Sequence, residues 1–185
     1  MVASARDEVD RMAASALDRC RDAGLYLAAA ESLTGGLLAD AFVRIPGASD
    51  VFLGSAVTYD IAAKASILGV DADLLSSQGA VHPKVAEQMA IGAARLYTQR
   101  GHEGRVIGLS TTGVAGPGPD GADPAGLVYI GIALPEGMAL GDDSGPTRLE
   151  GYRARSLELH LQGGREDVRR GTVAQVLERL GLALA

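Results

Sequence analysis

The spacing of apolar residues along the chain separates segments that form helices from segments that form strands. A period of three to four residues predicts helices over residues 5–22, 37–45, 62–68 and 165–180, and a further helix that begins at Pro83. Short apolar runs predict strands over residues 25–30, 51–59, 106–109 and 127–134, and alternation predicts another over 157–161. Strands alternate with helices early and follow one another late. The pattern therefore predicts one layered α/β domain over residues 1–185 with a mixed sheet.

Composition narrows the class of protein and the compartment. The chain has 185 residues, and its 17 basic against 23 acidic residues give a net charge of −6, so we expect no nucleic-acid partner. No apolar run approaches the ~20 residues of a membrane span, and the first ten residues lack the apolar stretch of a signal peptide. The single cysteine, Cys20, lies on the apolar stripe of the first helix. We expect a cytoplasmic protein without a membrane partner, with Cys20 packed in the core.

The sequence argues against two familiar kinds of site, a dinucleotide site and a metal site. The segment from Gly116 to Gly121 matches G-x-G-x-x-G, but it contains two prolines and precedes a strand, whereas a dinucleotide site needs free amides at a helix start. The three histidines, His82, His102 and His160, lack the spacing of metal ligands. We expect no metal site and assign the histidines surface or structural roles.

A serine stands where the first predicted strand is followed by a helix. In the sequence Ser32-Leu33-Thr34-Gly35-Gly36 such a turn would point the Ser32 hydroxyl into the crevice where α/β proteins bind ligands. The amides of Thr34, Gly35 and Gly36 could then hold a phosphate or an oxyanion. The alternative is a helix N-cap followed by a tight glycine turn, and the residues alone leave both interpretations open.

Lysine is rare in this chain, which draws attention to the positions that keep it. Only Lys64 and Lys84 are lysines among the 17 basic residues. Lysine, unlike arginine, can lose its proton when buried and serve as the base for a serine nucleophile. Lys64 lies on the helix after the second strand, and Tyr59, at the end of that strand, could relay a proton or orient Lys64. The alternatives are a surface lysine and a tyrosine that packs on the sheet.

Several separated motifs occur in the order seen in the CinA C-terminal domain family, also called the nicotinamide mononucleotide (NMN) amidohydrolase or deamidase family. They are Glu31-Ser32-Leu33-Thr34-Gly35-Gly36, Pro46-Gly47-Ala48-Ser49, Tyr59 with Lys64, Gly79-Ala80-Val81 and Thr112-Gly113-Val114-Ala115-Gly116-Pro117-Gly118. The resemblance covers roughly residues 25–180. It implies a three-layer α/β/α sandwich with a mixed, mostly parallel sheet, on which the helix within residues 1–24 packs. It also implies hydrolysis of NMN to nicotinate mononucleotide and ammonia, with no metal or organic cofactor.

The resemblance places the family's active-site serine, tyrosine and lysine on Ser32, Tyr59 and Lys64. We expect Ser32 to be the nucleophile and Lys64 its base, with Tyr59 bridging or orienting the two. Residues expected to bind the oxyanion and the nucleotide are Thr34, Gly35, Gly36, Thr112, Gly113, Gly116 and Arg165. Arg165, at the start of the last helix, is either the partner of the phosphate or a solvated helix-end residue.

The chain departs from the family pattern at a few positions. Leu33 stands where the family usually has Cys, Ile61 where it often has Asn, and Gly164 where Asp precedes the arginine, and the connection over residues 135–146 is longer than usual. These departures keep two alternatives open: a nucleotide-binding or accessory protein with weak catalysis, or an amidase for another amide. We expect the stand-alone form of the domain, acting in the salvage of pyridine nucleotides as a homodimer.

Overall fold

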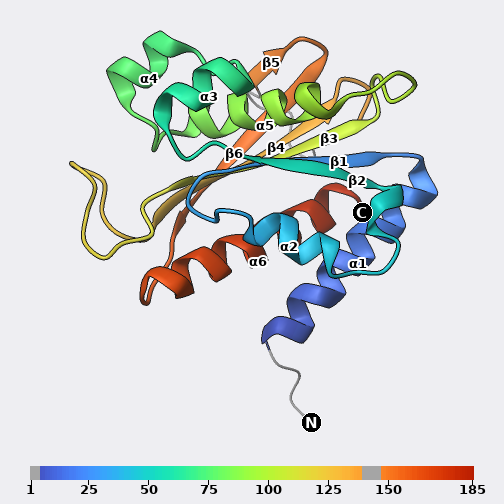
Figure 1. Ribbon diagram of the computed structural model, residues 1–185, viewed down its shortest axis with the longest axis horizontal. Coiled ribbons are helices and arrows are strands. Elements are labelled where there is room, and N and C mark those ends of the chain that lie inside the picture. Colours follow the sequence, from blue (N-terminus) through green and yellow to red (C-terminus); the bar gives the residue numbers. More distant parts are fainter. Residues whose placement is uncertain (1–4, 139–146) are drawn as a thin grey trace.

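The computed structural model of the chain describes residues 5–138 and 147–185 and contains one sheet between two layers of helices (Figure 1). The strands are β1 (Tyr26–Glu31), β2 (Phe52–Val57), β3 (Val106–Gly113), β4 (Leu127–Pro135), β5 (Thr147–Leu149) and β6 (Tyr152–His160). The helices are α1 (Ala5–Ala23), α2 (Leu37–Val43), α3 (Ile61–Leu68), α4 (Ala72–Gln78), α5 (Pro83–Tyr97) and α6 (Arg165–Ala183), with a 3-10 turn, η1 (Ala48–Asp50).

The two helical layers confirm the α/β/α sandwich. Helices α1, α2 and α6 cover one face of the sheet, and α3, α4 and α5 cover the other (Figure 1). Helix α1 packs on α2 and α6. Because each layer buries its own apolar stripe against the sheet, the described chain has separate apolar clusters on the two faces.

The sheet is mixed, with the strand order β2-β1-β3-β4-β6-β5. Strands β2, β1 and β3 pair in parallel, whereas the pairs β3–β4, β4–β6 and β6–β5 are antiparallel. The strands β1, β2, β3 and β6 consequently run in one direction. The expectation of a mostly parallel sheet therefore holds for strand direction, but among the described strands antiparallel pairs outnumber parallel ones.

Helix α5 lies unusually close to the centre of the sheet. A Cβ atom on Gly108 in β3 would lie 1.9 Å from the carbonyl oxygen of Ala90, and one on Gly131 in β4 would lie 2.4 Å from that of Ala86. Both distances are far below van der Waals contact, so only glycine permits this approach of helix backbone to strand backbone. On the opposite face, Cys20 is fully buried, and burial raises the pKa of its thiol to about 12, which confirms it as a core residue.

Two elements were not expected from the sequence. Helix α4 begins after Asp71, whose carboxylate accepts from the amides of Asp73 and Leu74, and it ends at Gly79. Strand β5 pairs antiparallel with β6 at the end of the long connection, of which residues 139–146 lie outside the described part. No helix in the described part of the chain is long and apolar enough to cross a membrane.

Candidate active site

The parallel arrangement of β2, β1 and β3 brings three chain segments to one edge of the sheet. Glu31, the last residue of β1, pairs with Val57 in β2 and Thr111 in β3. The amide of Ser32 donates to the carbonyl of Thr111 at 3.0 Å, and the amide of Thr58 donates to the carbonyl of Glu31 at 2.9 Å. Ser32 therefore lies between the ends of two neighbouring strands, where α/β sheets bind ligands.

The structure brings Ser32 and Lys64 into direct contact. Helix α3 begins after Asp60, whose carboxylate accepts from the amide of Ala63, and one turn later it places Lys64 beneath the end of β2. The Lys64 Nζ atom lies 3.1 Å from Ser32 Oγ and donates to the Thr58 carbonyl at 2.5 Å. Ser32 keeps 9% of its surface exposed and Lys64 keeps 1%, so solvent reaches the serine but not the lysine.

Burial changes the acidity of Lys64. It lowers the pKa of the ammonium from 10.5 to about 8, partly opposed by the nearby Asp60 carboxylate. With that pKa, about a quarter of the lysine side chains are neutral at about pH 7.5, against roughly one in a thousand for an ordinary lysine. The second lysine, Lys84, instead lies half exposed and forms an ion pair with Glu87 at 2.9 Å. The two lysines thus have different surroundings: Lys64 is buried against Ser32, and Lys84 connects α5 to β5 through Thr147.

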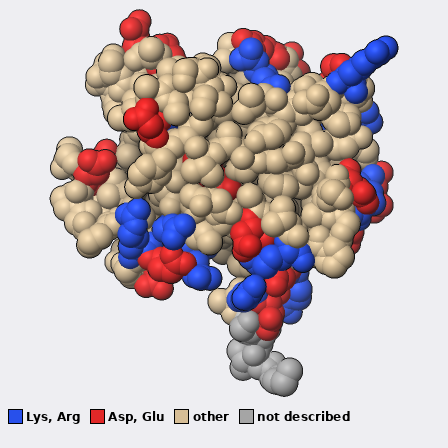
Figure 2. All heavy atoms as spheres, viewed as in Figure 1, with Lys and Arg blue, Asp and Glu red and all other residues tan. Residues whose placement is uncertain are grey.

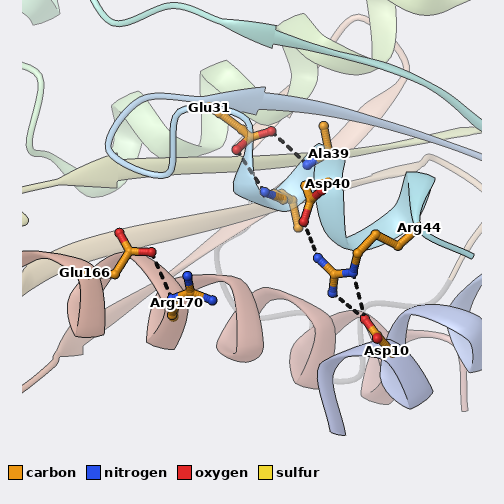
Figure 3. A network of polar contacts seen from close by, with 8 residues as sticks. Asp10, Glu31, Ala39, Asp40, Arg44, Glu166 and Arg170 are labelled. Atoms are coloured by element: carbon orange, nitrogen blue, oxygen red, sulfur yellow. Dashed lines mark hydrogen bonds and ion pairs between the residues drawn. The ribbon is translucent and has the colours of Figure 1, made fainter. Parts of the chain in front are cut away.

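A buried glutamate closes the N-terminus of α2 (Figure 3). Glu31 is fully buried, and its carboxylate accepts from the amides of Gly36, Leu38 and Ala39 at 2.9–3.0 Å and from the Ser55 hydroxyl at 2.8 Å. Because these donors bind Glu31, the start of α2 is not a site for a phosphate or an oxyanion. The amide of Gly35 is also used, since it donates to the Ser32 carbonyl at 3.2 Å. The two glycines adopt positive φ angles, 54° and 99°, so their conformation explains their presence here.

Replacing Glu31 by glutamine should destabilise the protein by about 2–4 kcal/mol. The amide group of glutamine turns an N–H toward donors that need an acceptor, and the charge that completes the helix start is lost. Glu166→Gln, at an exposed carboxylate on α6, is the matched control and should stay within about 0.5 kcal/mol of the parent. Urea unfolding followed by circular dichroism measures both. Equal stability of the two variants would contradict this role for Glu31.

Further ion pairs connect α2 to the neighbouring helix. Arg44 at the end of α2 contacts Asp40 in α2 and Asp10 in α1, as Figure 3 shows. Beside this network, a cavity of about 630 Å³ lies between α1, α2 and α6. Neither Ser32 nor Lys64 lines it, so the cavity is separate from the Ser–Lys contact.

Three predicted site residues that are far apart in the sequence meet at the surface. Arg165, at the start of α6, donates to the Gly116 carbonyl at 2.6 Å and to the Tyr59 hydroxyl at 3.3 Å. The Tyr59 side chain is 65% exposed and does not stand between Ser32 and Lys64. Because Lys64 contacts Ser32 directly, no bridging tyrosine is required, and the structure instead associates Tyr59 with Arg165.

The remaining predicted residues have mainly structural contacts. Thr112 and Gly113 lie within β3 rather than in a loop, and they pair with Tyr129 and Val128 of β4. The hydroxyl of Thr112 donates to the Ala80 carbonyl at 2.7 Å. The Thr34 hydroxyl is 2.8 Å from that of Thr111 and fixes the turn after Ser32 to β3.

The histidines have the structural and surface roles expected of them. His82 caps α5, His102 stacks on Tyr26, and His160 contacts Glu158. Within residues 5–138 and 147–185, no group of three His, Cys, Asp or Glu side chains is placed to hold a metal ion. On the face drawn in Figure 2, Lys and Arg side chains lie in groups together with Asp and Glu rather than forming one basic surface.

The sequence did not single out three residues that build this site. Glu31 is part of the recognised motif, but its role in capping α2 depends on the path of the turn. Thr58 contributes the carbonyl that binds Lys64, and its buried hydroxyl has no hydrogen-bond partner among the described residues. Arg169 donates to the carbonyls of Leu33 and Thr34, and only its position one helical turn after Arg165 could have suggested this.

Known proteins of one family are similar to the chain over nearly its whole length. The profile of the CinA C-terminal domain matches residues 9–184. A CinA-like protein from Frankia casuarinae is 46% identical over 129 residues, and one from Synechococcus sp. is 41% identical over 164 residues. These alignments cover 70% and 88% of this chain but 28% and 34% of the relatives. The chain thus spans about a third of the length of the curated relatives it matches.

Solved structures have the same arrangement of strands and helices. The competence/damage inducible protein CihA from Agrobacterium tumefaciens is 32% identical with a TM-score of 0.76, and the match covers 96% of this chain and 95% of that one. A CinA superfamily protein from Enterobacter cloacae is 25% identical with a TM-score of 0.80, covering 96% and 92%. The likeness therefore extends over almost the complete length of both solved chains.

Proposed function

Because the chain belongs to the CinA C-terminal domain family and places a buried lysine against a serine, we propose that it is an amidohydrolase that deamidates a nicotinamide nucleotide. The observation that supports this most is the 3.1 Å contact between Lys64 Nζ and Ser32 Oγ. A serine hydroxyl is a weak nucleophile until a neighbouring base takes its proton. A lysine with a pKa lowered to about 8 is such a base near neutral pH.

The reaction follows from the positions of these two groups. Neutral Lys64 keeps one N–H on the Thr58 carbonyl and accepts the Ser32 proton as Oγ bonds to the carboxamide carbon. The C–N bond then breaks, and the leaving nitrogen takes the proton from Lys64 and departs as ammonia. Water, deprotonated by the same lysine, hydrolyses the resulting ester and regenerates Ser32. The pyridinium ring of a nicotinamide nucleotide withdraws electrons from the carboxamide, which makes its carbon easier to attack.

The surroundings of the Ser32 turn support a nucleotide as the substrate. Arg169 contacts the backbone of the segment that follows Ser32, and Arg165 precedes Arg169 by one turn of α6. The Arg165 guanidinium, which contacts Gly116, therefore lies on the same side of the molecule as this segment. It is exposed and has donors beyond those bound to Gly116 and Tyr59. A phosphate bound by Arg165 would leave the nicotinamide end of the same molecule free to reach Ser32.

Ammonia release from a panel of amides tests the function. The panel contains NMN, nicotinamide riboside, nicotinamide, glutamine and asparagine, and the Ser32→Ala protein serves as the control for contaminating amidases. We expect NMN to be hydrolysed fastest and nicotinamide riboside, which lacks the phosphate, more slowly. Preference for another amide would exclude the nucleotide but keep the amidase. Absence of ammonia from all five would contradict the amidohydrolase and favour a binding protein of the same fold.

The pH dependence of kcat/KM is a separate expectation. Since only neutral Lys64 accepts the proton, kcat/KM should rise about tenfold per pH unit on the acid side and level off above the pKa of about 8. If the Lys64 ammonium were instead needed to bind an anion, kcat/KM would fall as the pH rises through the pKa of Lys64. Initial rates between pH 6 and 10 at subsaturating NMN measure the profile. A profile that falls through pH 8 would contradict Lys64 as the base.

A further inference from the structure

The turn that follows Ser32 leaves two of its amides without an acceptor. The amides of Gly35 and Leu37 donate to the carbonyls of Ser32 and Thr34 at 3.2 and 3.1 Å. Those of Gly36, Leu38 and Ala39 donate to the Glu31 carboxylate. In the described part of the chain, the amides of Leu33 and Thr34 have no hydrogen-bond acceptor. They belong to the two residues that directly follow the nucleophile.

The carbonyl side of the same turn is bound by an arginine from α6. Arg169 Nε donates to the Leu33 carbonyl at 3.0 Å, and Nη2 donates to the Thr34 carbonyl at 2.9 Å. The third nitrogen, Nη1, contacts Glu166 at 2.7 Å. The Arg169 side chain is 25% exposed, less than half the 66% of its neighbour Arg170, which contacts the same carboxylate. Two N–H groups of the Arg169 guanidinium thus donate to neighbouring backbone carbonyls of this turn.

Peptide geometry relates the contact on the Leu33 carbonyl to the direction of the Thr34 amide, whereas the contact on the Thr34 carbonyl fixes the peptide unit of the Gly35 amide, which already donates to the Ser32 carbonyl. In a planar trans peptide unit, the carbonyl and the N–H point opposite ways, and the Leu33 carbonyl shares its unit with the Thr34 amide. Because the carbonyl points toward α6, the Thr34 N–H points away from it. Helices α6 and α3 lie on opposite faces of the sheet (Figure 1), so this N–H is directed to the side from which Lys64 reaches Ser32. A hydrogen bond on the carbonyl also strengthens the N–H of its unit as a donor.

We propose that Arg169 is a positioning residue that orients the amide of Thr34, beside the free amide of Leu33, as the oxyanion hole for a substrate attacked by Ser32. The inference rests on the proposed function and adds to it the location of the oxyanion and the residue that prepares it. An amide next to the nucleophile is the usual donor in strand–turn–helix sites. Arg169 itself does not touch the substrate. Its positive charge, on the carbonyl side of the Leu33–Thr34 peptide unit, further favours negative charge at the Thr34 amide.

The test measures the reactivity of Ser32 without requiring the natural amide. An alkyl fluorophosphonate phosphonylates an activated serine: the Oγ–P bond forms as the P–F bond breaks, fluoride leaves, and the serine proton passes to Lys64. The phosphoryl oxygen then occupies the position of the oxyanion. Mass spectrometry follows the rate of labelling at Ser32 in the parent, Arg169→Ala, Arg169→Lys, Arg170→Ala and Glu166→Gln. Arg170→Ala and Glu166→Gln are matched controls because they remove the ion pairs of this helix turn and leave the guanidinium on the carbonyls.

Arg169→Ala should label about 10- to 100-fold more slowly, somewhat less than the loss of an oxyanion donor itself, because the Thr34 amide remains but is misdirected. Arg169→Lys should recover part of the rate, since it reaches one carbonyl, and both controls should stay within about twofold of the parent. Where NMN is hydrolysed, kcat per labelled site should fall while KM and the acid-side pKa stay unchanged. Methylguanidinium at millimolar concentration should restore part of the rate in Arg169→Ala.

The outcomes separate this inference from the function on which it rests. Parent-like labelling of folded Arg169→Ala, with Ser32 reactive in the parent, would overturn the role of Arg169 and leave the Ser–Lys amidase intact. A shift of the acid-side pKa in Arg169→Ala would also overturn it, because the arginine would then act on the base rather than on the oxyanion. A parent protein that is not labelled at Ser32 would overturn both proposals.

Discussion

Ser32→Ala is expected to lower ammonia release by at least about a thousandfold while the fold stays intact. The substitution removes only the Oγ atom, which lies 3.1 Å from Lys64 Nζ, and leaves the Ser32 amide on the Thr111 carbonyl. Within the described part of the chain, Lys64 Nζ contacts no hydroxyl other than that of Ser32, so no substitute nucleophile lies beside it. The activity that remains would come from water attack within the bound complex.

Ser66→Ala is the matched control for Ser32, because Ser66 lies on the same helix as Lys64 but is exposed. Turnover with NMN, or with whichever amide the panel selects, is compared at equal concentrations of folded protein. Ser66→Ala should retain parent activity. If Ser32→Ala kept more than about a tenth of the parent turnover, a deficit below about 1.4 kcal/mol, Ser32 would not be the nucleophile.

Substitution of Lys64 should separate activity from stability. Arg keeps the charge but cannot lose its proton near neutral pH, so Lys64→Arg should be nearly as inactive as Lys64→Met, both about a thousandfold below the parent. A lysine that only supplied charge would instead tolerate arginine. Turnover of both variants between pH 7 and 9 decides between the two roles. Retention of most of the activity by Lys64→Arg would contradict a role as base.

Lys64→Met is expected to be more stable than the parent at pH 7. The folded-state pKa of Lys64, about 8, lies below the unfolded value of 10.5, so the unfolded chain binds more protons between these two values. The free energy of unfolding of the parent therefore rises as pH rises from 8 toward 10.5. At pH 7 it is lower by up to about 3 kcal/mol than it is above pH 10.5. Loss of the contacts to Ser32 and the Thr58 carbonyl offsets part of that gain in the variant.

Urea unfolding of parent and Lys64→Met at several pH values measures this effect. The stability advantage of the variant should shrink by about 3 kcal/mol between pH 7 and 10.5. The comparison isolates Lys64, because every other titrating group is common to both proteins. A difference in unfolding free energy that does not change with pH would mean that the folded and unfolded states bind the Lys64 proton equally well.

The sequence predicts those parts of the fold that depend on local pattern. The apolar stripe of α1 and the near-continuous apolar run of β4 determine these elements within a few residues of their observed bounds. Helix α4 was missed because its seven residues contain no complete apolar period, although Asp71 before it and Gly79 after it are the residues of a helix cap and a helix end. Strand β5 is three residues long, and its pairing with β6 is not a local property.

The site residues likewise comprise those that a local sequence pattern indicates and those whose contacts arise only in the folded chain. Ser32 could be placed because a strand, a turn and a helix follow one another directly, and Lys64 because lysine is rare in this chain. Their contact depends on the parallel register of β1 and β2, which no local pattern specifies. Glu31, at the end of β1, was overlooked because the amides that donate to its carboxylate reach it only when the turn folds back on it. Arg169, 135 residues after Thr34, has a nearby acidic partner in Glu166 and is indistinguishable in sequence from a solvated helix residue.

The titration of Lys64 itself tests the central claim most directly, namely that this lysine is the neutral base beside Ser32. Because the chain contains only Lys64 and Lys84, protein labelled with ¹³C at lysine Cε gives two lysine signals, and the one absent from Lys64→Met belongs to Lys64. We expect that signal to titrate with a pKa of about 8 and the acid side of the kcat/KM profile to follow it. A Lys64 signal that titrates at 10.5 or above would contradict the account, because the side chain would then be an ammonium throughout the working pH range.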